Sequence, residues 1–222
     1  WSLACAPFLL LDRLNALRSY RIQNEPKNQR AIKAVAKRMV ILNWMLLFPT
    51  VCVAAPVMLW LFPSHAQPPS LWRAPFTAAL WFLLHDMSFY AYHRMLHEVP
   101  WLYRTVHKPH HLLTTPFAWG SHAVHPLEMM LQSLGAMAGP LVWSALYSLP
   151  LQALWAWLAL VQVQGVMDHS GYDLPRPLDV FKCFPGFGGT AFHDDHHRYL
   201  NGNYAAALSV IDDIMGTRLR KV

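Results

Sequence analysis

The sequence predicts an all-α protein, a multi-span integral membrane helical bundle with a cytosolic histidine-rich helical cap. Composition is the first observation: 55% of the 222 residues are hydrophobic and 14% are charged, against about 25% charged in an ordinary soluble domain. The second is a series of long uncharged runs, of the kind that crosses a bilayer in about 20 residues. The third is that nine of the thirteen histidines fall in four short clusters outside these runs.

Taken in order, the apolar runs predict about four full spans and a truncated first one. Residues 1–11 are typical of the end of a spanning helix, and because the chain begins there at Trp1, we expect a segment to precede it. Prolines interrupt the second run, which membrane helices tolerate better than soluble ones do. The last two runs are separated by three residues and predict a helical hairpin. The four full spans are predicted at residues 39–62, 75–92, 126–147 and 151–167.

The polar segments between the runs decide the orientation. Residues 12–38 carry eight Lys and Arg against two acidic residues, and such basic loops stay in the cytoplasm. Counting crossings from there places residues 93–125 and the polar tail 168–222 in the cytoplasm as well. All four histidine clusters are then expected on one face of the membrane. We divide the chain into N-terminal membrane segments with a basic loop (1–74) and a catalytic domain (75–222).

The histidine clusters predict a metal centre. Neutral imidazole is a transition-metal ligand, and one ion takes about four to six ligands, so nine histidines favour two ions. In HKPHH (107–111) and HDDHH (193–197) the first two histidines are one helical turn apart and the third points elsewhere, a pattern suited to feeding two metals, or one metal from two directions. Pro109 makes the first of these a turn or a helix start. The predicted ligands are His93, His97, His107, His110, His111, His169, His193, His196 and His197.

Three further side chains are assigned to the catalytic site. Asp86 and Tyr90 lie seven and three residues before His93, on the same helical face, and a carboxylate there can orient a ligand imidazole through its second nitrogen. His125 is the third. For His122 and His125 (SHAVHP, 121–126) the sequence leaves metal ligation, support of a ligand and a structural role open.

The residue pattern also argues against several chemistries. No HExxH motif accompanies the histidines, and the three cysteines lie far apart, so a zinc hydrolase site is not indicated. The Glu and Glu-x-x-His pattern of carboxylate-bridged diiron bundles is absent too. A histidine-rich diiron centre at a membrane surface remains, suited to O₂ activation on a lipid. We expect no nucleic-acid partner.

Several motifs resemble the fatty acid hydroxylase superfamily, the membrane-bound diiron oxygenases, over residues 75 to 217. DMSFYAYHRMLH (86–97) matches its first histidine box. VPWLYRTVHKPHH (99–111), DHSGYDLP (168–175) and HDDHH followed by GNYA (202–205) are closest to the cholesterol 25-hydroxylase branch. TPFA and SHAVHP (115–126) resemble the sterol C5-desaturases, and HPLE (125–128) resembles the sterol C4-methyl oxidases. The closing family motif lacks its Trp here, where Ile211 stands.

The resemblance implies a membrane-bound monooxygenase that hydroxylates an unactivated C–H bond of a sterol or related lipid, using O₂ and two electrons. It implies two iron ions held by the nine histidines, with His125 as an additional contributor. It further implies an electron donor such as cytochrome b5 or its reductase, and the endoplasmic reticulum as the location in a eukaryote. Two alternatives stay open, namely a desaturase on the same site and a non-catalytic lipid-binding membrane protein. The presence of all nine histidines argues against the second.

Overall fold

The computed structural model describes residues 1–23, 29–66, 70 and 73–219. These residues form helices and connecting loops with no β-strand; two isolated bridges pair Arg21 with Tyr172 and Phe187 with Leu208. The all-α prediction is therefore confirmed for the part of the chain described. The longer helices are α1 (Ser2–Leu14), α2 (Gln29–Leu61), α3 (Ala74–Glu98), α5 (Pro126–Ser144), α6 (Leu151–Asp168), α7 (Gly189–Tyr199) and α8 (Ser209–Met215).

Short helical turns connect them and carry much of the polar chain. A brief helix α4 and a π-helical turn η2 follow α3 directly, and Pro109 separates η2 from η3, as its missing N–H and fixed φ predict. Residues 24–28, in the predicted basic loop, lie outside the described residues. The short elements are η1 (Arg18–Tyr20), α4 (Pro100–Leu102), η2 (Tyr103–His107), η3 (His110–Leu112), η4 (Ala118–His122) and η5 (Phe181–Cys183).

Helix α2 corrects one predicted boundary. It begins at Gln29, ten residues before the apolar run, so the basic residues 30–38 form its first turns rather than a loop. Within the described residues, α2 is the single helix both long and apolar enough to cross a membrane, over Arg30–Leu61. The four full spans predicted from the sequence are thus not confirmed as a set, although helices do occupy all four positions.

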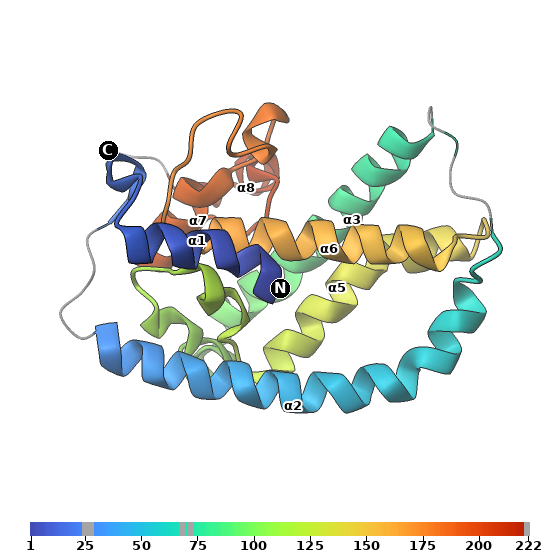
Figure 1. The fold of residues 1–222 in the computed structure, drawn as a ribbon, viewed down its shortest axis with the longest axis horizontal. Helices are drawn as coiled ribbons and strands as arrows, with labels where there is room; N and C mark the ends of the chain where they lie inside the picture. The colour runs from blue at the N-terminus through green and yellow to red at the C-terminus, as the bar shows by residue number, and fades with distance from the viewer. Residues whose placement is uncertain (24–28, 67–69, 71–72, 220–222) are drawn as a thin grey trace.

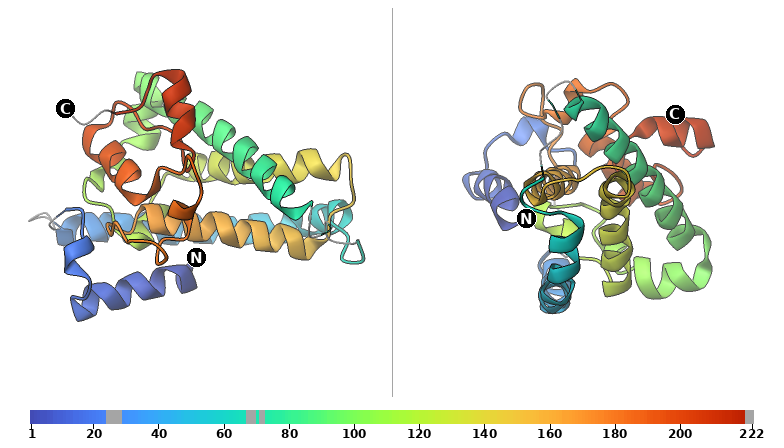
Figure 2. Two further views of the ribbon diagram at one scale, coloured as in Figure 1. Left: turned by 90° about the horizontal axis from the view of Figure 1, so that it is seen from above. Right: turned by 90° about the vertical axis from the view of Figure 1, so that its right-hand side faces the viewer.

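The helices are arranged with α2 and α6 along the long axis of the molecule and α3 and α5 running obliquely beside them (Figures 1 and 2). The pair α3 and α5 packs closely: a Cβ on Gly139 would lie 2.7 Å from the Cα of Trp81, so only glycine permits this approach. The Trp157 indole of α6 donates a 2.7 Å hydrogen bond to the carbonyl of Ala136 in α5. This packing fixes the far end of the bundle.

The opposite end of the bundle brings together the segments that carry histidine. The C-terminal half of α3, the turns η2 and η3, the end of α6 and helix α7 meet there (Figure 1). Helix α1 packs over this end through Cys5 and Phe8, which lie in one apolar cluster with Val166 and Tyr172. The fold therefore converts four clusters that are distant in sequence into one buried region.

Candidate metal centre

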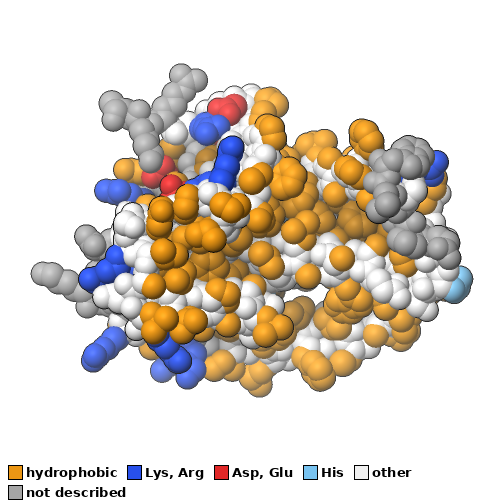
Figure 3. Space-filling model, turned by 45° about the horizontal axis from the view of Figure 1, so that its top comes forward, with side chains coloured by type: hydrophobic (Ala, Val, Ile, Leu, Met, Phe, Trp, Pro, Cys, Tyr) orange, Lys and Arg blue, Asp and Glu red, His pale blue; other side chains and the backbone are white. Residues whose placement is uncertain are grey.

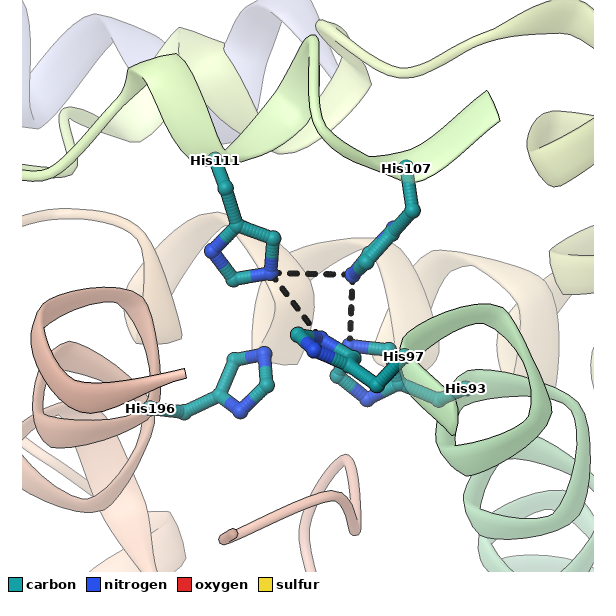
Figure 4. A group of neighbouring side chains, drawn as sticks. All are labelled: His93, His97, His107, His111 and His196. Carbon is teal, nitrogen blue, oxygen red and sulfur yellow. Dashed lines mark hydrogen bonds between the residues drawn. The ribbon is translucent and has the colours of Figure 1, made fainter. Parts of the chain in front are cut away.

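The nine predicted histidines lie together in two groups. The ligating nitrogens within each group are all within 4.8 Å of one another, and in Figure 4 the rings of the first group turn toward a common point. We call them the five-histidine group and the four-histidine group. The five-histidine group contains His93, His97, His107, His111 and His196; the four-histidine group contains His110, His169, His193 and His197.

The partition of the two HxxHH boxes differs from the prediction. The first and third histidines of a box, four residues apart, share a group, and the second joins the other group. In HDDHH this follows from helix α7, on which His193 and His197 lie one turn apart on one face while His196 is rotated away. Each box therefore contributes to both groups.

Carbonyl and carboxylate oxygens fix the orientation of several rings. In the five-histidine group, Nδ1–H of His93 donates to the Tyr204 carbonyl at 2.7 Å and Nδ1–H of His196 donates to the Gly202 carbonyl at 2.8 Å. In the four-histidine group, His110 donates to the Ala123 carbonyl at 3.2 Å and His169 to the Gly165 carbonyl at 2.8 Å. Such contacts fix the tautomer and direct the other ring nitrogen inward.

Burial keeps these rings uncharged. Desolvation lowers the pKa of His107 and His169 to about 3 and that of His110 to about 4, from the ordinary value of 6.5. Each ring therefore carries one proton at neutral pH, which is the form that binds metals.

The protonation pattern provides a test of whether a metal fits. Nε2 of His110 and Nε2 of His169 are 3.3 Å apart, yet each ring has its proton on Nδ1, so two lone pairs face each other with no hydrogen between them. A shared cation removes this repulsion. Two nitrogens bound to one ion at about 2.1 Å are about 3 Å apart, which agrees with the spacing. A donor set of neutral imidazoles suits a transition-metal ion.

A loop at residues 202–208 supports the five-histidine group, and Asp86 anchors it. The Asp86 carboxylate accepts hydrogen bonds from the backbone N–H groups of Ala206 (2.6 Å), Ala207 (3.1 Å) and Leu208. Asp212 accepts from the N–H groups of Tyr204 and Ala205 at 2.8 and 2.9 Å. The prediction that Asp86 contacts an imidazole was wrong, because the carboxylate is consumed by the loop whose carbonyls hold His93 and His196.

Tyr90 and His125, the other two predicted catalytic residues, lie outside both groups. The Tyr90 hydroxyl accepts a hydrogen bond from Arg94 at 2.9 Å and lies 3.1 Å from the Thr217 hydroxyl. His125 caps α5, where its Nδ1 accepts from the Leu127 N–H at 3.1 Å. Their assignment to the catalytic site stays a prediction. His122 also belongs to neither group, and its Nε2 lies 2.7 Å from Oε1 of Gln162.

Glu128 is a site residue that the sequence reasoning missed. Its carboxylate is buried and accepts a hydrogen bond from Nδ1–H of His107 at 2.9 Å, while Gln132 donates to its other oxygen at 3.4 Å. A buried carboxylate needs such partners. The only available signal was a Glu in the first turn of a helix, within HPLE and three residues after His125.

Comparison with known proteins agrees with this centre. The family model described as fatty acid hydroxylase matches residues 78–217. The chain belongs to the fatty acid hydroxylase family. The match begins in α3 and ends after α8, and so includes all nine histidines of the two groups.

Individual relatives cover most of the chain. A putative methylsterol monooxygenase of Dictyostelium discoideum is 35% identical over 213 residues, which span 95% of this chain and 77% of that protein. Methylsterol monooxygenase 2-2 of Arabidopsis thaliana is 33% identical, over 95% of this chain and 78% of that protein. A very-long-chain aldehyde decarbonylase of rice, GL1-11, is also 33% identical with the same coverage. No solved structure matches the chain.

Proposed function

We propose that this protein is a membrane-bound diiron monooxygenase that hydroxylates an unactivated C–H bond of a sterol or related lipid. One observation carries the proposal: nine neutral histidines, eight of them buried, form two groups whose inner nitrogens need cations to lie so close together. The methylsterol monooxygenases among the relatives support a sterol as the substrate. The overall reaction consumes O₂, two electrons and two protons, and returns the alcohol and water.

The nine histidines hold two iron ions in this proposal, one in each group. When bound, iron supplies the activation of O₂ and the attack on the C–H bond, chemistry that side chains cannot perform. The chain contributes orientation. Four of the rings are held by backbone carbonyl oxygens, and the ring of His107 is held by the Glu128 carboxylate. The carbonyls belong to Gly202, Tyr204, Ala123 and Gly165.

Burial is the second contribution of the chain. Eight of the nine histidines are buried, and only His97 is partly exposed. Excluding water strengthens electrostatic interactions in the site and prevents side reactions. Asp86 and Asp212 act indirectly, because they fix the loop that supports the five-histidine group. In this proposal Tyr90 and His125 support the structure around the site.

Helices α2, α3, α5 and α6 cross the membrane in this proposal. The shortest, α6, has 18 residues, which at 1.5 Å per residue spans about 27 Å, close to the hydrocarbon thickness. Apolar side chains cover most of the face in Figure 3, whereas Lys and Arg gather mainly at its left-hand end, the side on which the histidine-bearing helix α7 lies in Figure 1. That distribution supports a cytosolic centre, in a catalytic domain of residues 75–222 that follows the membrane segments 1–74. Electrons then come from a cytosolic donor such as cytochrome b5 or its reductase, at the endoplasmic reticulum in a eukaryote.

The test is an untargeted lipid profile of cells that express the complete protein, compared with cells that express a His196→Ala, His197→Ala double variant. This pair removes one ligand from each group. We expect a lipid that gains one oxygen atom with the wild type only. A lipid that loses two hydrogens would instead establish desaturation. No difference between iron-loaded wild type and variant, with electron donor supplied, would contradict the proposal.

A further inference from the structure

His122 lies among aromatic rings at the junction of α1, α2 and η4. The rings of Trp1 and Trp44 stack on it at centroid distances of 4.9 and 5.9 Å, and the two indoles are 6.0 Å apart. Trp1 also donates to the Ser121 hydroxyl at 3.1 Å. In Figure 1 the N-terminal end of α1 lies between α6 and α2. We call His122, Trp1 and Trp44 the aromatic cluster.

Two buried acceptors in this region have no hydrogen-bond partner among the residues that the structure describes. Nε2–H of His122 donates to Gln162 at 2.7 Å, so Nδ1 holds the lone pair, and that nitrogen makes no hydrogen bond although the residue is only 6% exposed. Asn43 uses its amide N–H groups on the carbonyls of His122 (3.0 Å) and Val124 (2.8 Å), while its Oδ1 is unpartnered. Buried polar atoms are normally paired, so each such exception needs an explanation.

The aromatic cluster lies next to the four-histidine group. Residue 123, adjacent to His122, supplies the carbonyl that orients His110. Gln162 lies one turn before Gly165 on α6, whose carbonyl orients His169. His122 is nevertheless not a member of that group. A molecule held at His122 Nδ1 is therefore placed beside the candidate metal centre without displacing a ligand.

We propose that His122 accepts a hydrogen bond from the hydroxyl group of a sterol and so positions the sterol for oxidation at the neighbouring centre. A sterol is a flat apolar ring system with one hydroxyl, which matches flat indole surfaces around one acceptor. Trp44 is 41% exposed on the apolar helix α2, which gives a membrane-resident molecule a route to His122. Because His122 is nearly covered, binding requires an indole ring to move aside. This assignment of a recognition residue rests on the proposed function.

The experiment measures binding of a methylsterol and of the same sterol with hydrogen in place of its hydroxyl, to the purified iron-loaded protein without O₂. The wild type is expected to bind the alcohol about tenfold more tightly, as one hydrogen bond allows. His122→Phe retains ring stacking and should bind the two sterols equally. His122→Asn retains a polar atom near the Nδ1 position and should restore part of the preference. His65→Phe, an exposed histidine in a distant loop, serves as the control.

Several outcomes overturn the assignment. A His122→Phe protein that still prefers the alcohol shows that the hydroxyl binds elsewhere or that a water pairs with Nδ1. Loss of iron, or equal loss of affinity for both sterols, shows that His122 only supports the fold. Because binding is measured without turnover, a preference for the alcohol that depends on His122 stands even if the protein oxidises no lipid.

Discussion

The two histidine groups differ in how they are supported, although one helix, α7, serves both. The five-histidine group has a carboxylate behind His107, a loop clamped by two aspartates behind His93 and His196, and one partly exposed member, His97. The four-histidine group is fully buried and is supported by two backbone carbonyls. The rings of the five-histidine group are thus supported by a side-chain carboxylate and a clamped loop, whereas those of the four-histidine group are supported by backbone carbonyls alone.

This difference predicts unequal metal affinity. Removing one of five imidazoles leaves four, which is still a full set for one ion, whereas removing one of four leaves three. Ionised carboxylates behind a ligand raise its basicity more than carbonyls do. The four-histidine group should therefore bind its ion more weakly, and it leaves more coordination positions of that ion for ligands from outside the chain.

The largest expected effect comes from removing one ligand of each group in turn. His193→Ala and His196→Ala change the same helix but different groups. Both should reduce product formation more than the 10- to 100-fold typical of supporting residues. Iron analysis of the purified proteins should find close to one iron per chain in His193→Ala and close to two in His196→Ala. Equal iron loss in both variants would contradict the predicted order of affinities, and His65→Ala should behave as wild type.

Acid should destabilise the metal-free protein. The folded-state pKa values of His107, His110 and His169 are about 3 to 4, below the value of 6.5 expected when unfolded. Between about pH 6.5 and 4 the unfolded chain therefore binds more protons, so the free energy of unfolding falls as the pH falls, by about 1.4 kcal/mol per pH unit for each such histidine. Denaturant titrations at several pH values measure this slope.

The same titrations compare the two groups. His107→Phe and His169→Phe each remove one buried imidazole, from the five- and the four-histidine group respectively. Both should reduce the pH slope by about one histidine's share, because desolvation is the first cause of both shifts. A slope that neither variant changes would show that these rings are not the groups that resist protonation.

Asp86→Asn tests the clamp that distinguishes the five-histidine group. The charged acceptor for three backbone N–H groups is lost, which should cost about 1–3 kcal/mol of stability. Iron should be lost from the five-histidine group alone, because the loop holds His93 and His196. Asp213→Asn is the matched control, since that exposed carboxylate pairs with Arg218 at the surface. Normal iron content in Asp86→Asn would show that the loop keeps its position without the clamp.

How much the sequence predicts depends on how local the cause is. Helices occupy the four predicted apolar runs. These could be predicted because the length and hydrophobicity of a run are read from that segment alone. The predicted start of α2 was ten residues too late. A basic segment indicates which side of the membrane it lies on more reliably than it indicates whether it is a loop or a helix. The nine histidines could be chosen from their clustering, but their division between groups depends on the π-turn before Pro109 and on the rotation of α7. Asp86 was misassigned because its partners are 120 residues away.

Glu128 gives the smallest expected effect and isolates the carboxylate in the comparison of the two groups. Glu128→Gln keeps the size of the side chain and an acceptor for Nδ1–H of His107 but removes the negative charge. We expect about tenfold weaker iron binding in the five-histidine group, and no change in the four-histidine group, whose supports are carbonyls. Competition with a chelator measures both affinities. Glu98→Gln is the matched control, because Glu98 is exposed and pairs with Arg94 on α3. If Glu128→Gln binds iron as tightly as Glu98→Gln does, orientation of the ring rather than its charged partner sets the affinity, and the Glu128 charge does not distinguish the two groups.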